Sequence, residues 1–278
     1  MSYILKFVSS LGEFEMGGGR DSFFRLSGVV GLGFPDVERQ TVVYSGRRGE
    51  KTVSKRFLPR VITISGDVVR EEDVRKIIRV LSEEGTLYVN SKGGERTIDV
   101  LASSVEEPRK IGDITRMVIQ FIADDPAFSD SVPDRQGIYE RVNLVKGSFT
   151  APCVFTRRVV GGNFINSGDL KSEPVITVLC NNSAGVKSTL ILKNDDTGAK
   201  IELTHTFLSG DVITINTKTA EITDRTGRSV LSAISDDTYL TEFVMDRGNN
   251  NISVVSSELA NNLQVICEYK KKYLEALL

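Results

Sequence analysis

Hydrophobic residues in the segment 55–90 change their spacing twice, which predicts a strand, a helix and a second strand. The β-branched residues of segment 61–64 favour a strand, and Pro59 suits its first position. Over residues 71–84 the spacing becomes helical, and one apolar face is formed by Val74, Ile77, Ile78 and Leu81. We expect all four side chains to be buried against a sheet, each contributing roughly 1.5–3 kcal/mol.

Other alternating segments predict strands on both sides of this helix. They lie near residues 3–7, 23–28, 40–44, 86–90, 96–105 and 115–122. Residues 91–94 are expected to form a hairpin turn, and Asp124, Asp125 and Pro126 a second turn. The glycines at 17–19 predict a flexible turn, since the Lys-Ser/Thr of a phosphate-binding loop does not follow them.

The second half of the chain has strand periodicity almost throughout. Segments rich in Asn, Asp and Gly separate the predicted strands, which lie near residues 153–160, 174–181, 186–193, 200–207, 211–217, 220–223, 251–256 and 263–269. Short strands at this spacing are typical of a sandwich or jelly roll. A short helix is expected at residues 270–278.

Length and pattern together predict two domains. A polar, linker-like segment spans residues 129–147, so we expect a first domain at 1–135 and a second at 142–278. The expected fold is mainly β, with an α+β first domain that places one helix on a sheet or sandwich, and a β-sandwich second domain. We expect a fragment ending near Arg135 to fold by itself, and one starting near Val142 to fold as a monomer.

Charge and hydropathy narrow the range of functions. The formal net charge is −2, so no general attraction to nucleic acid or to an anionic membrane is expected. No apolar segment approaches 18 residues, which predicts no membrane anchor. The first ten residues lack the basic and apolar regions of a signal peptide, so secretion by that route is not expected.

Residues suited to catalysis are few. His205 is the one histidine and lies in a strand-like segment, so we expect a structural role, and neither a histidine metal site nor a catalytic triad. Cys153, Cys180 and Cys267 are far apart and are expected to be free, buried thiols in strands. Two acidic pairs, 195–196 and 236–237, lie in predicted turns. We therefore expect no enzyme, no cofactor and no metal.

Basic residues concentrate between positions 46 and 60, where Glu50 is the one acid. They are Arg47, Arg48, Lys51, Lys55, Arg56 and Arg60. One interpretation is a nucleic-acid patch. The other is a solvated hairpin whose bases pair with acids of a neighbouring chain, and we favour it because no aromatic residue interleaves the bases before Phe57.

Three segments resemble the distal tail proteins (Dit type) of phages with long non-contractile tails. The first is the strand 60–64, the helix 71–84 and the strand Gly-Thr-Leu-Tyr-Val at 85–89. The second is the strand 115–122 with its Asp-Pro-Ala-Phe turn, 125–128. The third runs from Ser209-Gly210-Asp211 through 220–223 to Tyr239-Leu240 and 248–255. Asp246-Arg247 departs from the Leu-x-Pro approach of many relatives.

This resemblance implies a structural protein of the phage tail tip. It implies a first domain that closes into a ring, commonly a homohexamer, and a second domain of galectin-like or carbohydrate-binding-module type. The ring would join the tail tube protein to the tip and baseplate proteins, with a receptor-binding protein as a further partner, and let DNA pass. The protein would belong to the virion tail and assemble in the host cytoplasm. Its ring-interface region would be Arg47, Arg48, Lys55, Arg56 and Arg60.

The alternative function is a carbohydrate-binding second domain that contributes to host adsorption. Sugar sites use exposed aromatic rings, and the chain has no Trp. Tyr239 and Phe243 are the available rings, although packing in the core would equally explain them. A jelly-roll fold permits this function without establishing it.

Overall fold

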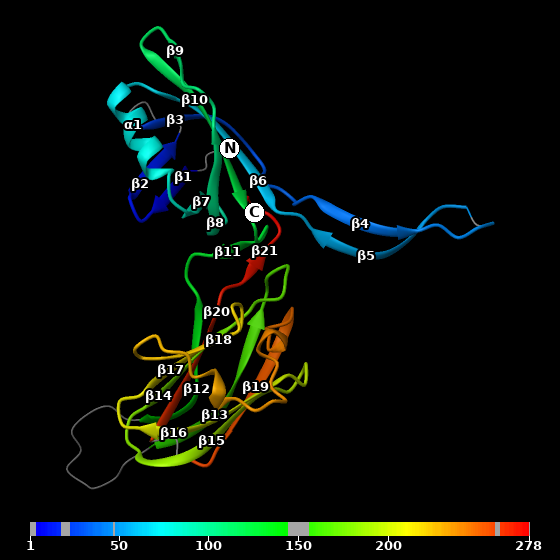
Figure 1. Ribbon diagram of the computed structural model, residues 1–278, viewed down its shortest axis with the longest axis vertical. Coiled ribbons are helices and arrows are strands. Elements are labelled where there is room, and N and C mark those ends of the chain that lie inside the picture. Colours follow the sequence, from blue (N-terminus) through cyan, green and yellow to red (C-terminus); the bar gives the residue numbers. More distant parts are fainter. Residues whose placement is uncertain (1–3, 18–22, 47, 144–155, 259–261, 278) are drawn as a thin grey trace. The chain divides into compact units, whose positions relative to one another are not determined.

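The computed structural model describes residues 4–17, 23–46, 48–143, 156–258 and 262–277 (Figure 1). Contacts divide the chain into two compact units. The first unit contains residues 1–131 together with 272–278, and the second contains residues 132–271. The fold is mainly β, as the sequence predicts, with one α-helix.

The first unit is built on one sheet that closes into a barrel. Seven strands form the closed cycle, because β8 pairs with β7 on one side and with β10 on the other, in the order β8, β7, β1, β2, β3, β6 and β10. Their bounds are β1 Ile4–Ser9, β2 Gly12–Gly17, β3 Phe24–Val30, β6 Arg60–Val68, β7 Gly85–Ser91, β8 Gly94–Val105 and β10 Ile114–Ala123. Three short strands extend the sheet: β9 Arg109–Ile111, β11 Phe128–Asp130 and β21 Lys272–Tyr273.

Alternation along these strands fills the barrel with apolar side chains. Leu5 and Phe7 of β1, and Ile62 and Ile64 of β6, are buried completely. The Phe7 ring lies 5.2 Å from the ring of Phe121 in β10, centroid to centroid. The period of two therefore decides which side of each strand faces the core.

Helix α1 (Glu71–Val80) packs on β2 and β6, and its apolar face differs from the predicted one. Ile77 is fully buried, whereas Ile78 is 46% exposed, so the prediction of burial at Ile78 is wrong. Val80 is buried in its place, and the Oγ of Ser9 donates a hydrogen bond of 2.8 Å to the Val80 carbonyl. This bond fixes the end of the helix to the β1–β2 hairpin and turns Ile78 towards solvent.

The second unit is a β-sandwich made from one nine-stranded sheet. The sheet order is β16, β15, β19, β13, β12, β20, β14, β17 and β18. The strands are β12 Asp134–Asn143, β13 Thr156–Asn166, β14 Val175–Cys180, β15 Ala184–Asn194, β16 Lys200–Leu208, β17 Val212–Asn216, β18 Glu221–Asp224, β19 Gly248–Ser256 and β20 Leu263–Tyr269. Two 3-10 turns, Leu231–Ala233 and Leu240–Glu242, cover one core that both halves of the sheet share.

Strand β13 carries the chain from one half of the sandwich to the other. Residues 156–160 pair with β12, and residues 161–166 pair with β19. Gly161 at the change of partner has φ +142°, and a Cβ there would lie 2.6 Å from the Ile252 carbonyl oxygen. Glycine is required at this bend because any side chain would meet the backbone of β19.

The two units differ from the expected domains at the boundary between the domains and at the C-terminal end of the second domain. Residues 129–147 are not a linker over their described part, since they contain the end of β11 and all of β12. The described residues of the segment 270–278, which are 270–277, do not form the expected helix: β21 pairs with β11, and the Ala276 N–H donates to the Leu32 carbonyl at 2.9 Å. Pairing with distant backbone outweighs the weak helical preference of this segment. None of the described helices is long and apolar enough to cross a membrane.

The return of residues 272–278 revises the expected behaviour of the fragments. A fragment of residues 1–135 lacks the strand that pairs with β11, so we expect it to melt lower than the first unit of the whole chain and to be cleaved sooner by protease. Joining 272–278 to residue 131 through a short Gly-Ser linker should restore both properties, because Ser129 and Lys272 are register partners. Circular dichroism and limited proteolysis measure this. Equal melting of the two fragments would show that the segment adds no stability.

Candidate assembly interface

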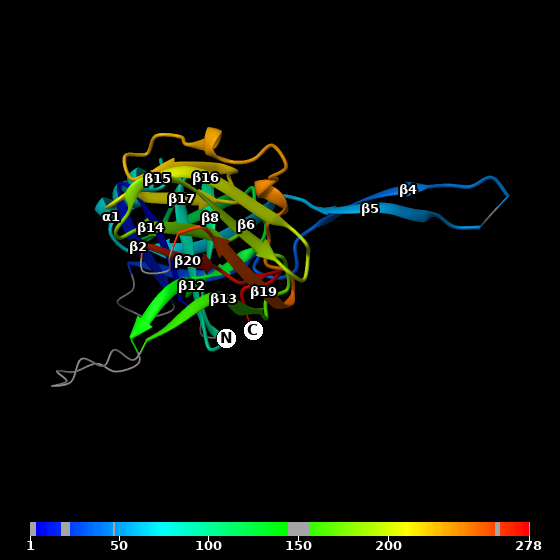
Figure 2. The same ribbon diagram turned by 90° about the horizontal axis from the view of Figure 1, so that it is seen from below.

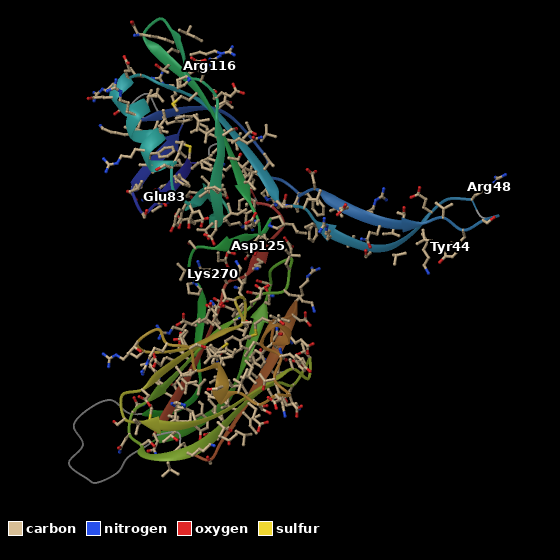
Figure 3. The ribbon with its side chains drawn as sticks, in the orientation of Figure 1. Tyr44, Arg48, Glu83, Arg116, Asp125 and Lys270 are labelled. Carbon is tan, nitrogen blue, oxygen red and sulfur yellow. The ribbon has the colours of Figure 1, made fainter. Side chains whose placement is uncertain are left out.

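A two-stranded arm leaves the barrel between β3 and β6. It consists of β4 (Val37–Val42) and β5 (Lys51–Phe57), which pair with each other and with no other described strand. Both views show the arm extending away from the barrel of its unit (Figure 1, Figure 2). Between Val37 and Phe57 every described residue is exposed. Tyr44 and Arg48 lie near its tip (Figure 3).

Most of the predicted interface residues lie on this arm. Arg48 is exposed at the tip, and Lys55 and Arg56 are exposed on β5. Arg47 lies outside the described residues. Arg39, on β4 and opposite Lys55, was missed because the basic segment was read along the chain rather than across the hairpin. The hairpin register would have revealed it.

Arg60 does not belong to this exposed group. It begins β6, its residue is only 3% exposed, and its guanidinium lies over the Phe128 ring, 4.7 Å from the centroid. In the folded unit its side chain is therefore covered by the unit itself. Burial lowers the pKa of Arg60 to about 10, against a smaller opposing effect of Asp36, so the group is charged at neutral pH.

The Arg60 guanidinium joins three separate parts of the chain through carbonyl groups. Its Nη1 donates to the carbonyls of Gly31, at 2.7 Å, and Gly33, and its Nε donates to the Pro126 carbonyl at 2.7 Å. Its Nη2 donates to the Leu274 carbonyl at 2.7 Å. Arginine suits this position because its planar group offers five donors in a fixed geometry. Arg60 thus fixes the start of the arm to the Asp-Pro turn and to residues 272–277.

Further contacts hold residues 272–277 at the same place. The Lys272 Nζ lies 2.8 Å from the Asp125 Oδ2. Arg96 stacks on the Tyr273 ring at 3.8 Å and donates a hydrogen bond to the Glu275 carbonyl. Asp125 also accepts the Ala127 N–H at 3.2 Å, which confirms the predicted turn before Pro126. The base of the arm is therefore a rigid platform.

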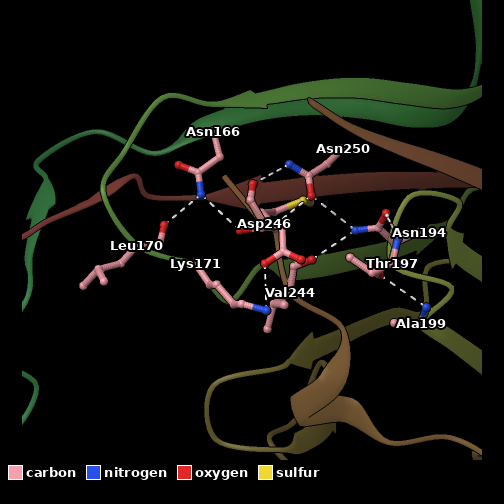
Figure 4. Close-up of polar contacts among 10 residues, drawn as sticks. Asn166, Leu170, Lys171, Asn194, Thr197, Ala199, Val244, Asp246 and Asn250 are labelled. Atoms are coloured by element: carbon pink, nitrogen blue, oxygen red, sulfur yellow. Dashed lines mark hydrogen bonds and ion pairs between the residues drawn. The ribbon is translucent and has the colours of Figure 1, made fainter. Parts of the chain in front are cut away.

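Three buried asparagines organise loops of the second unit (Figure 4). The Asn166 Nδ2 donates to the carbonyls of Leu170 and Met245, both at 3.0 Å. The Asn194 Nδ2 donates to the Val244 carbonyl at 3.0 Å, and the Asn250 Nδ2 to the Asp246 carbonyl at 2.8 Å. Their carboxamides are used by neighbouring backbone groups, so this cluster is a structural element and offers no binding groups to a ligand.

The structure shows where the residues considered for catalysis lie. The acidic pairs at 195–196 and 236–237 lie in turns, and the described residues contain no group of His, Cys, Asp and Glu that could hold a metal. Cys180 and Cys267 are free and buried in strands, as predicted, and burial raises the pKa of both thiols. Cys153 lies outside the described residues.

His205 lies in β16 and packs edge-on against Phe207, with ring centroids 5.3 Å apart. We expect His205→Ala to leave the oligomeric state unchanged, because the residue belongs to the second unit and not to the arm. Light scattering coupled to gel filtration measures the mass of variant and wild type. A smaller assembly with unchanged circular dichroism would show instead that His205 takes part in assembly.

Comparison with known proteins agrees with this architecture. Residues 167–273 match the family described as siphovirus-type tail component, C-terminal domain. The Dit protein of phage SPP1, described as a paradigm of the hub adsorption apparatus in phages infecting Gram-positive bacteria, is similar in structure, with a TM-score of 0.66 and 12% identity. The match covers 98% of this chain and 99% of that protein.

Two structures of the phage P2 baseplate in its activated conformation are also similar. The form with Ca has a TM-score of 0.60 at 12% identity, covering 98% of both chains. The form with Sr has a TM-score of 0.58 at 11% identity, covering 97% of this chain and 98% of the other. No curated protein sequence matches the chain. The family match to residues 167–273 and the fold shared over both units agree with the resemblance predicted from the sequence: residues 167–273 match a siphovirus-type tail component domain, and the whole chain is similar in fold to the distal tail (Dit) protein of phage SPP1.

Proposed function

We propose that copies of this chain close into a ring, most simply of six, at the tip of the phage tail. The ring joins the tail tube protein to the tip and baseplate proteins, a receptor-binding protein among them, and DNA passes through its centre. Assembly takes place in the host cytoplasm. The observation that carries the proposal is the exposed arm, whose two strands pair with no other described strand and whose described residues between Val37 and Phe57 are all exposed.

An isolated two-stranded hairpin is only marginally stable in water. This arm also exposes apolar side chains at Val42, Val43, Tyr44 and Val53. The outer edges of β4 and β5 carry unpaired backbone groups that another surface can pair. A neighbouring subunit that covers the arm removes all three of these costs together.

The arm and its acceptor are different surfaces of one chain, so the contact is heterologous. Heterologous contacts generate a closed ring when the rotation between subunits closes, and an open filament when it does not. The platform around Arg60 sets the direction of the arm relative to its barrel, and thereby the rotation between neighbours. Arg48 and Lys55 belong to the proposed interface, and Arg60 acts by holding the arm.

Glycan binding by the second unit is not favoured. Phe243 is fully buried in the sandwich core, so it cannot form a sugar platform, whereas Tyr239 is 63% exposed. The similar solved structures come from tail hubs and baseplates. Host adsorption in the proposed assembly is therefore a task of proteins attached to the ring.

Removing the arm tests the proposal. Residues 38–56 can be replaced by two glycines, because Val37 and Phe57 are register partners at its base. We expect light scattering of the wild type to give about six times the chain mass of 30.6 kDa, and the variant to give one chain mass with unchanged melting. A ring that survives removal of the arm would refute the role of the arm. A wild type that stays monomeric at every concentration would refute self-closure.

A further inference from the structure

The two faces of the arm differ in how their polar groups are paired. Side chains alternate between faces along a strand, and register partners share a face. One face carries the partners Glu38 with Arg56 and Gln40 with Ser54. We call it the paired face. The other carries Val37 with Phe57 and Arg39 with Lys55, and we call it the unpaired face.

Polar groups on the paired face bind one another. The Arg56 Nε lies 2.5 Å from the Glu38 Oε2, and the Ser54 Oγ donates to the Gln40 Oε1 at 2.9 Å. Glu38 and Arg56 carry charges of opposite sign at directly paired positions, which stabilises the hairpin within one chain. These two pairs are therefore satisfied within a single subunit.

The unpaired face places two cations directly opposite each other. The side chains of Arg39 and Lys55 are exposed and make no hydrogen bond or ion pair with any described side chain. Like charges in register destabilise a strand pair. Towards the base of the arm, the same face continues into half-buried Val37 and Phe57, and the Phe57 ring packs edge-on against Phe34 at 5.8 Å. The face therefore combines an apolar base with unneutralised positive charge.

The charge of the remaining first unit is complementary to this face. Residues 36–57 contain six basic and three acidic side chains. The rest of the first unit contains fourteen basic and eighteen acidic side chains, whereas the second unit is nearly balanced, with fifteen basic and sixteen acidic. Carboxylates in excess of the available cations thus lie on the body of the first unit.

We propose that the unpaired face is the contact face of the arm, and that Arg39 and Lys55 bind carboxylates on the first unit of a second copy of this chain. The inference rests on the proposed ring. Neutralising the Arg39–Lys55 repulsion in the assembled state makes the arm more stable when docked than when free. It also favours docking by this face, since Arg56 on the paired face is already neutralised by Glu38.

Neighbouring residues of β5 provide a matched test. Lys55→Glu and Arg56→Glu change the charge equally, in adjacent positions on opposite faces. We expect Lys55→Glu, and likewise Arg39→Glu, to raise the concentration at which half the chains are assembled at least tenfold, and Arg56→Glu to raise it less than threefold. Sedimentation velocity measures the distribution, and circular dichroism checks that the fold is retained.

Zero-length crosslinking identifies the acceptor. A carbodiimide joins amines to touching carboxylates, and mixing nitrogen-15-labelled with unlabelled wild-type chains distinguishes links between copies. We expect Lys55 to be linked to an acidic residue of the first unit of another copy.

Three results would overturn the inference while leaving the ring standing. Equal effects of Lys55→Glu and Arg56→Glu in a protein that forms rings would overturn the choice of face, and so would a larger effect of Arg56→Glu. Links from Lys55 to the second unit would overturn the choice of acceptor. A wild type without rings would instead refute the proposed function on which the inference rests.

Discussion

Replacing Ile77 with aspartate is expected to unfold the first unit near room temperature. Ile77 is fully buried in the barrel core together with Val74, Val80 and Leu81. A carboxylate in this place loses its hydration without gaining a partner, which costs about 3–5 kcal/mol. Since a domain has only ~5–15 kcal/mol of stability, a large part of it would be lost. Thermal melting and limited proteolysis of the whole chain measure the change.

Ile78→Asp is the matched control, since it makes the same change one residue along the helix. Ile78 is about half exposed, so its carboxylate stays hydrated and the free energy of unfolding should change by no more than about 0.5 kcal/mol. Equal destabilisation by both variants would contradict the position of the helix. A smaller destabilisation by Ile77→Asp than by Ile78→Asp would support the buried helix face predicted from the sequence.

The second large effect is expected from Arg60→Met. Methionine retains much of the side-chain volume but leaves the carbonyls of Gly31, Pro126 and Leu274 without their donor. Hydrogen bonds from a charged donor are worth about 1.5–3 kcal/mol each, so a loss of roughly 3 kcal/mol or more is expected. The arm should lose its fixed direction as well, and amide hydrogen exchange should rise at residues 31–33 and 272–277.

Arg56→Met is the control for this variant, because Arg56 forms an exposed ion pair worth at most about 1 kcal/mol. It should change neither the melting temperature nor the exchange at these two segments by a measurable amount. If Arg60→Met melted like the wild type, the Arg60 network would be a consequence of the fold rather than a support of it.

Periodicity predicts the strands of this protein well because the pattern records which side of each strand is buried. Leu190 and Leu192 in β15, and Ile201 and Leu203 in β16, alternate in the sequence and are all fully buried. The helix was predicted from the same kind of pattern. The rotation of the helix about its own axis could not be predicted in this way. Val74, Ile77 and Leu81 belong to one apolar face that includes Ile78 and to another that includes Val80, and only the packing of the helix end selects between the two faces.

Interactions between segments that are distant in the sequence cannot be predicted from hydrophobic periodicity, which is a local pattern. Closure of the barrel depends on the pairing of β8 with β10, and the platform depends on residues more than 200 positions apart. Arg60 was placed with the exposed bases because it follows them in the sequence. The sequence does contain one signal of its burial. Arg60 lies two residues before Ile62 and four before Ile64, so its side chain is on the same face of β6, the face towards the barrel interior.

The discontinuous first unit has a consequence for biosynthesis. Residues 272–277, which Arg60 and Arg96 bind, are translated only after the entire second unit of residues 132–271. Domains generally fold as units while the chain emerges from the ribosome. The barrel can form early, but the platform that aims the arm is completed only when translation reaches these residues. Truncated translation products therefore lack the contacts of Arg60 with Leu274 and of Arg96 with Glu275 that hold the platform together.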